Sequence, residues 1–177
     1  MPEKSYTLGG DEKATPVMVY TLTSMAWGDV VTKDQVRVST YLRTLNPDYV
    51  SLHEARVLPM GSAPNQAMPF SELHVRTPQV IAFHLLPNAP AEPMDFDPSE
   101  ANRKMEPATA LVGPFRFDAN LRISNILTLA KYVEIFTDVY ISLYDAAVTC
   151  PQMPALGTVR APLVLVRRDA CSFAPRG

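Results

Sequence analysis

Three histidines are the residues of this chain best suited to metal binding or proton transfer. They are His53, His74 and His84, and all three lie in the N-terminal half. A zinc site needs three or four ligands that converge on one point. His53 and its neighbour Glu54 would point to opposite faces of a regular strand. We therefore expect neither a metal site nor a cofactor, and we assign the histidines to surface or half-buried positions.

Two serines, Ser51 and Ser142, are the candidates for nucleophilic catalysis. Each stands between apolar residues, so it faces outward if its segment is a strand. Neither lies in a Gly-x-Ser-x-Gly elbow, and a cross-strand hydrogen bond is the simpler role. The nearby Glu54 and Asp145 can accept backbone N–H groups at a bend. The seven glycines show no phosphate-loop spacing. The sequence thus indicates a protein that is not an enzyme.

Positive charge is concentrated at Arg160, Arg167 and Arg168. These arginines could form a rim that holds an anion or the acidic segment 87–107 of a neighbouring molecule, or they could be a solvated strand end. The whole chain has 16 Lys and Arg against 18 Asp and Glu. Proteins that bind nucleic acid usually carry an excess of basic residues. The composition therefore argues against nucleic acid as the partner.

Large apolar side chains occur in a segment expected to be a loop, residues 59–72. They are Met60, Met68 and Phe70. Apolar groups on a loop can cover a core, or they can anchor a partner. Together with the three arginines, they are our candidate contacts for a partner or an anion.

The elements that position these residues occur twice. Residues 49–57 (YVSLHEARV) return as 140–148 (YISLYDAAV), at an offset of 91 positions and with five of nine residues identical. A second similarity, 75–78 with 159–162, has an offset of 84 and predicts seven extra residues in the loop of the first copy. Two similarities in the same order indicate an internal duplication.

The repeat divides the chain into four segments. We expect a flexible N-terminal segment (1–15), a first small β-domain (16–86), a linker (87–107) and a second small β-domain (108–173). The linker contains five prolines and five acidic residues, a composition that cannot bury much surface.

Within each copy the apolar pattern is mainly that of strands, with one helical interval. Val38, Tyr41, Leu42 and Leu45 have the spacing of one helical face, and Ser39 could cap this helix. The second copy repeats the spacing over 129–136. We expect strands at 17–22, 27–31, 49–57 and 140–148, and closing strands at 80–83 and 163–166.

The repeated strand changes phase in its middle. Val50 and Leu52 lie on one face, whereas Ala55 and Val57 lie on the other. A bulge at 53–54, and another at 144–145, would return both pairs to the core. The predicted fold is mainly β with short helices: two tandem small antiparallel β-barrel-like domains.

Two segments of the second copy resemble the Sm-like small-barrel family. Leu143-Tyr144-Asp145-Ala146 resembles the end of its bent strand, and 164–169 (VLVRRD) resembles its Arg-Gly-Asp turn, with Arg168 in the place of glycine. The resemblance implies an Sm-like or SH3-like barrel that binds RNA or an anion. The helix departs from this family because it lies between strands. The chain also resembles uncharacterised bacterial proteins, and that resemblance implies no activity.

Composition suggests a folded protein, with 47% hydrophobic and 19% charged residues. No apolar run reaches the roughly 20 residues of a membrane span, and the N-terminus has no apolar core of a signal peptide. Cys150 and Cys171 are expected to be free thiols. We therefore expect a cytoplasmic protein without a membrane span.

These observations favour a non-enzymatic protein-interaction or assembly module. Its partner would be another protein, or further copies of the chain in a homo-oligomer. The alternative is an RNA- or anion-binding Sm-like module, drawn from the resemblance and from Arg167 and Arg168.

Overall fold

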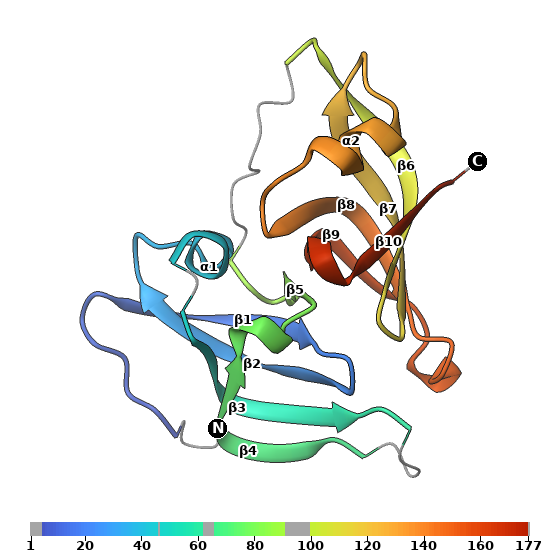
Figure 1. Cartoon of the computed structure of the whole chain (residues 1–177). Coiled ribbons are helices and arrows are strands. Elements are labelled where there is room, and N and C mark those ends of the chain that lie inside the picture. Colours follow the sequence, from blue (N-terminus) through green and yellow to red (C-terminus); the bar gives the residue numbers. More distant parts are fainter. Residues whose placement is uncertain (1–4, 46, 62–65, 91–99, 177) are drawn as a thin grey trace. The chain divides into compact units, whose positions relative to one another are not determined.

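A computed structural model describes residues 5–45, 47–61, 66–90 and 100–176 (Figure 1). The chain divides into two compact units, Met1–Pro90 and Ala91–Gly177. Both are mainly β, as predicted, and both contain a short helix between their second and third strands.

The first unit contains an antiparallel sheet with the strand order β5-β1-β2-β3-β4. Its strands are β1 (Glu12–Tyr20), β2 (Ser24–Lys33), β3 (Tyr49–Pro59), β4 (Met68–Arg76) and β5 (Ala82–Leu85). Helix α1 (Val38–Thr40) continues into a π-helical segment, Tyr41–Leu45, and a 3₁₀ turn, Thr77–Gln79, joins β4 to β5.

The second unit has an antiparallel sheet with the matching order β10-β6-β7-β8-β9. Its strands are β6 (Arg103–Val112), β7 (Phe115–Ser124), β8 (Tyr140–Thr149), β9 (Val159–Arg167) and β10 (Cys171–Pro175). Helix α2 (Leu129–Ile135) precedes β8, and 3₁₀ turns occupy Pro154–Leu156 and Arg168–Ala170.

Alternating apolar residues place one face of each sheet in the core. On β1, Val17 and Val19 are fully buried, and on β7 so are Phe117 and Leu121. This alternation has the period of two that a strand requires. Strand formation here follows from the β-branched and aromatic content of these segments.

The predicted helix is present, but its cap differs. Val38 and Leu42 are fully buried, whereas Leu45 is 61% exposed. Ser39 lies inside the helix and does not cap it; the N-cap is Arg37, which makes no side-chain capping bond. In the second unit the hydroxyl of Thr128 accepts from the Lys131 N–H at 3.3 Å.

Strand pairing corrects the sequence alignment of the two halves. Tyr49 pairs with Arg76 in the first unit, and Tyr140 pairs with Arg167 in the second. Tyr140 and Arg167 each lie 91 positions after their counterparts in the first pair. The offset of 91 therefore holds from the first strand of each unit through the fourth. The similarity at offset 84 was wrong, as was the predicted seven-residue insertion. A four-residue Val-Arg-x-Pro pattern is too short to fix a register.

The closing strand of the second copy was predicted wrongly for the same reason, and that of the first copy was placed two residues too early. Residues 163–166 belong to β9. In chain order, β9 is the fourth strand of the second unit and β10 is the fifth. In the first unit the fifth strand, β5, begins at Ala82. A fully closed barrel is not found: within the described residues, no ladder joins β4 to β5 or β9 to β10.

The predicted bulge is confirmed in both units. The register of β2 on β3 shifts by one residue between Trp27 and Asp29, and Glu54 has a φ of 49°. Asp145 has a φ of 51° beside the corresponding shift of β7 on β8. Beyond the bulge, Ala55 and Ala146 are each 1% exposed, so the strand has returned to its core face.

The domain boundaries differ from prediction at two places. Strand β1 begins at Glu12, so the last four residues of the predicted N-terminal segment 1–15 belong to the sheet. Strand β6 begins at Arg103, inside the predicted linker 87–107. The linker's central part, 91–99, lies outside the described residues.

Gly28 is the residue of β2 that faces the bulge, and we predict that replacing it destabilises the first unit. A Cβ there would lie 2.7 Å from the carbonyl oxygen of His53 and 3.1 Å from Cα of Ala55. Both are backbone atoms, so Gly28→Ala should lower the free energy of unfolding by about 2 kcal/mol. Urea denaturation measures this. The control is Gly10→Ala, where a Cβ meets nothing within 4 Å; an equal loss in both variants would contradict the account.

Substitutions of Asp145 test whether the backbone at the second bulge is left-handed. Its side chain is exposed, so substitutions act mainly through the backbone. Asp145→Gly should leave stability unchanged or raise it, because glycine adopts positive φ without strain. Asp145→Val should lower it by about 1–2 kcal/mol. Thermal unfolding compares the two; a valine variant as stable as the glycine variant would show that the backbone there is not left-handed.

Candidate functional site

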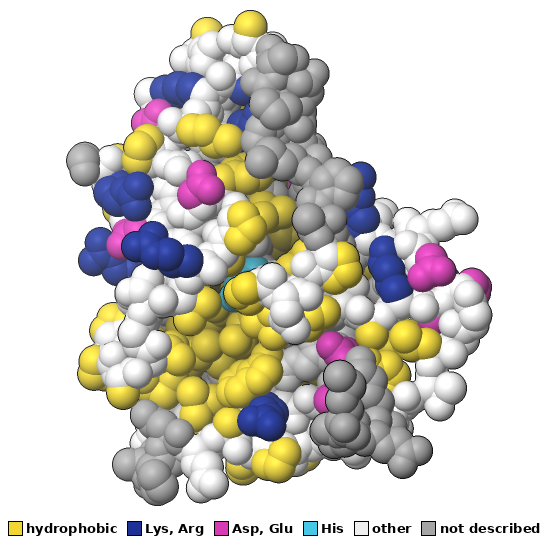
Figure 2. All heavy atoms as spheres, turned by 180° about the vertical axis from the view of Figure 1, so that it is seen from behind, with side chains coloured by type: hydrophobic (Ala, Val, Ile, Leu, Met, Phe, Trp, Pro, Cys, Tyr) yellow, Lys and Arg dark blue, Asp and Glu magenta, His cyan; other side chains and the backbone are white. Residues whose placement is uncertain are grey.

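Strand β4 is the outermost strand of the first unit's sheet, and it carries two of the predicted contact residues. Met68 is 45% exposed and Phe70 is 42% exposed. Both were expected on a loop, which was wrong, because they lie in the first half of β4. Met60 directly follows β3, is half-buried, and donates its N–H to the Thr23 carbonyl at 2.8 Å. Figure 2 draws the hydrophobic side chains of the described residues in yellow and shows that many of them reach the surface.

The second half of β4 directs alternate backbone groups away from β3. The N–H of Thr77 continues the ladder by donating to the Asp48 carbonyl at 3.0 Å. In an antiparallel pair, residues alternate between bonding the neighbour and facing away from it. Leu73 and Val75 therefore bond to β3 in the same way as Thr77. The backbone groups of the alternate residues, 72, 74 and 76, point to the outer edge.

Five polar side chains lie together across β2, β3 and β4, and we call them the polar cluster: Asp29, Ser51, His53, Glu72 and His74. Cross-strand pairing brings them together, since Asp29 is opposite His53, His53 is opposite Glu72, and Ser51 is opposite His74. The cluster is therefore a product of sheet register.

Contacts within the polar cluster centre on one carboxylate. Oε1 of Glu72 lies 3.8 Å from Nδ1 of His53 and 3.8 Å from Nε2 of His74. The Oγ of Ser51 and Nδ1 of His74 share a hydrogen bond of 2.9 Å. The cross-strand role expected for Ser51 is thus confirmed.

The N-terminal residues lie against this cluster. The Tyr6 hydroxyl donates to Oδ2 of Asp29 at 2.6 Å, and its ring centroid is 4.8 Å from that of His53. Ser5 donates its N–H to Oε1 of Glu54 at 2.6 Å, as expected of an acid at a bulge. Its hydroxyl donates to the Ser71 carbonyl at 3.1 Å. Sequence reasoning missed these contacts because they join segments far apart in the chain.

The three predicted arginines do not gather into one rim. Arg167 forms a fork with Asp169, with Nε to Oδ1 at 2.7 Å and a second bond of 3.1 Å. Arg168 donates to the Phe136 carbonyl at 2.8 Å. Arg160 is exposed and pairs with Ala147, seven residues along β9 from Arg167. At roughly 3.3 Å per residue, more than about 20 Å separates their backbones.

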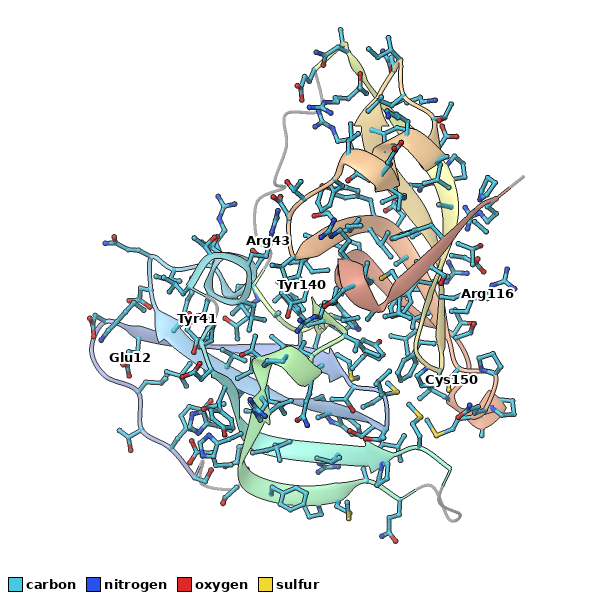
Figure 3. The ribbon with its side chains drawn as sticks, in the orientation of Figure 1. Glu12, Tyr41, Arg43, Arg116, Tyr140 and Cys150 are labelled. Atoms are coloured by element: carbon cyan, nitrogen blue, oxygen red, sulfur yellow. The ribbon has the colours of Figure 1, made fainter. Side chains whose placement is uncertain are left out.

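Metal ligands do not converge within the part of the chain that the structure describes: no group of three or more His, Cys, Asp and Glu side chains there could hold an ion. Cys150, directly after β8 (Figure 3), and Cys171 are free thiols, as predicted. Burial, together with Asp169, raises the pKa of the Cys171 thiol to about 12. A thiol with so high a pKa is a poor nucleophile at neutral pH.

The third histidine, His84, belongs to a separate buried pair. Its Nε2 lies 3.0 Å from the Tyr20 hydroxyl, and its Nδ1 lies 2.8 Å from the Leu85 carbonyl. A carbonyl can only accept, so Nδ1 carries the proton and Nε2 accepts from Tyr20. Both side chains are almost fully buried, so the surface or half-buried position expected for the histidines is wrong for His84. Burial raises the pKa of the Tyr20 phenol, which keeps it neutral and able to donate.

Comparison with protein-family models, with curated proteins and with solved structures found no match. No helix among the described residues is long and apolar enough to cross a membrane. The geometry of the chain itself is therefore the basis for any functional proposal.

His84 should make the stability of the first unit depend on pH. Burial holds its pKa below 6.5, and the bond to Leu85 opposes this only in part. Below pH 6.5 the unfolded chain binds a proton that the folded chain excludes. The free energy of unfolding should therefore fall as pH drops below about 6.5, by up to about 1.4 kcal/mol per pH unit.

The matched variants are His84→Gln, which removes the buried imidazole, and His74→Gln, which removes an exposed one. Urea denaturation at several pH values should show a smaller slope in His84→Gln, whereas His74→Gln leaves the contribution of His84 in place. An unchanged slope in His84→Gln would assign the pH dependence to another group.

Proposed function

We propose that this chain is a non-enzymatic protein-interaction or assembly module, and that the outer edge of β4 receives an extended segment of a protein partner. The observation that carries the proposal is the position of β4 at the end of its sheet. Its backbone groups at residues 72, 74 and 76 point outward. Adding a strand to such an edge is a common mode of peptide recognition.

The composition of β4 supports an edge that is only partly protected. Natural edge strands are usually blunted by proline or by charged residues, which prevents pairing with other chains. Pro69 does this in the first half of β4, while Glu72 and Arg76 are the charged residues of the second half. That second half has no proline, and the exposed Phe70 lies beside it. A partner strand would gain backbone hydrogen bonds along 72–76 and an apolar contact at Phe70.

The two units are, in this proposal, products of a duplication. Their strands from the first through the fourth share the offset of 91, and each fifth strand pairs with the first. A fifth strand returning beside the first is also compatible with the Sm-like or SH3-like kind of small barrel. The two free thiols are in keeping with a cytoplasmic location.

The alternative, an RNA- or anion-binding Sm-like module, is less well supported. It needs Arg160, Arg167 and Arg168 to present their guanidinium groups to a ligand. Arg167 is already paired with Asp169, and Arg168 is bonded to the Phe136 carbonyl. A phosphate would have to displace both contacts before it could bind there.

A photoreactive residue in place of Phe70 tests the interaction proposal in cells that normally make the protein. Irradiation should link this position to protein, and the adducts should disappear when His74→Pro removes an outward N–H from the edge. The control position is Leu111, which is 51% exposed but lies on β6, between two paired strands.

Leu73→Pro supplies the comparison for folding, because it removes a ladder bond to β3 and should destabilise the sheet. His74→Pro should unfold at a higher temperature than Leu73→Pro. Adducts of equal yield at positions 70 and 111, or adducts unchanged by His74→Pro, would contradict recognition at this edge.

A further inference from the structure

We propose that the occupant of the β4 edge is β4 of a second copy of this chain, paired antiparallel about a two-fold axis at Leu73. The inference rests on the proposed function and specifies its partner. Antiparallel pairing of one strand with itself is self-complementary, as the interface of a two-fold dimer must be.

The polar and charged side chains of β4 favour a second copy of the same strand as the partner. With the axis at Leu73, Glu72 lies opposite the partner's His74, and His74 lies opposite the partner's Glu72. Phe70 lies opposite the partner's Arg76 on each side of the axis. Cross-strand pairs of a carboxylate with a hydrogen-bond donor, and of a cation with an aromatic ring, stabilise a sheet. Every such contact occurs twice, because the axis repeats it.

Neighbouring registers fit less well. Moving the axis to Glu72 places this carboxylate opposite its own copy, and like charges in that position are destabilising. Moving it to His74 pairs Glu72 with the partner's Arg76 but leaves Phe70 without a counterpart and shortens the ladder. All three registers join the outward groups of residues 72, 74 and 76. The side chains therefore choose among them, and they favour Leu73.

Among the described residues, the Ser5 hydroxyl is bonded to the carbonyl of Ser71 on β4. In the alternation of this strand, Ser71 is not one of the residues whose backbone groups point to the outer edge. The contact therefore does not use the outward groups of residues 72, 74 and 76.

The same position in the second unit lacks this pattern. At the offset of 91, Glu72 corresponds to Leu163 and His74 to Leu165, and Phe70 corresponds to Ala161. Arg76 is kept as Arg167, but Glu72, His74 and Phe70, which complete the self-complementary pattern of β4, belong to the first unit alone.

Sedimentation of the full chain over a range of concentrations tests the dimer. The wild-type chain should dimerise reversibly, and Glu72→Lys should weaken dimerisation at least about tenfold, because it removes the carboxylate that faces the partner's His74. The double variant E72K/H74E again places a carboxylate opposite a donor and should recover most of the affinity. Glu134→Lys, the same charge change on an exposed residue of α2, should have no effect.

A disulfide measures the register directly. In a background without the native thiols (C150A/C171S), Leu73→Cys should form an intermolecular disulfide on oxidation. Residues at the axis face their own copies at about 4.5 Å between Cα atoms, which is within disulfide range. Ser71→Cys is the control, since it faces the partner's Val75 and should cross-link poorly.

A wild-type chain that remains monomeric at every concentration would overturn this inference, as would a dimer indifferent to Glu72→Lys or one linked as well by Ser71→Cys as by Leu73→Cys. If the chain is monomeric and position 70 still links to a different protein, the second copy is wrong and the interaction function stands. If position 70 links to no protein at all, both proposals fail.

Discussion

The close approach of Gly28 to the bulge in β3 is the constraint on which the first unit depends. Glu54 adopts a left-handed backbone, which inserts one extra residue opposite β2. This insertion allows Leu52 and Ala55, three positions apart, to share the core face, whereas strict alternation would separate them. Ser51 and His53 precede the bulge and lie on the outer face by ordinary alternation, where cross-strand pairing brings them to the other members of the polar cluster.

Local features of this fold could be predicted from the sequence because each depends on a few adjacent residues. The bulge follows from the break in alternation after Leu52, and the helix follows from the spacing of Val38 and Leu42. Long-range pairing could not be predicted in the same way. Whether Val75 corresponds to Val159 or to Val166 depends on which residues of β3 it faces, and a short apolar pattern carries no such information.

The candidate site shows the same difference between local features, which the sequence predicts, and long-range pairing, which it does not. Residue type alone indicated that Met68 and Phe70 are candidates for contact, but their place on an edge strand required the pairing of β4 with β3. The meeting of Ser51, His74 and Glu72 required that register as well, since more than twenty positions separate Ser51 from the other two. Arg167 and Arg168 were identified by charge, and their engagement by Asp169 and by a carbonyl could only be found in the folded chain.

The two units show how one scaffold can carry different edges. A bulge, a helical turn and a five-strand order are common to both, and these are features of the buried face and the backbone. On the fourth strand, Glu72 and His74 are exposed in the first unit, whereas the matching Leu163 is half-buried and Leu165 is buried in the second. An apolar edge can associate with many surfaces, whereas an edge bearing alternate acidic and basic groups discriminates by register. The specificity of such a module would therefore reside on β4, the part of the repeat that packing controls least.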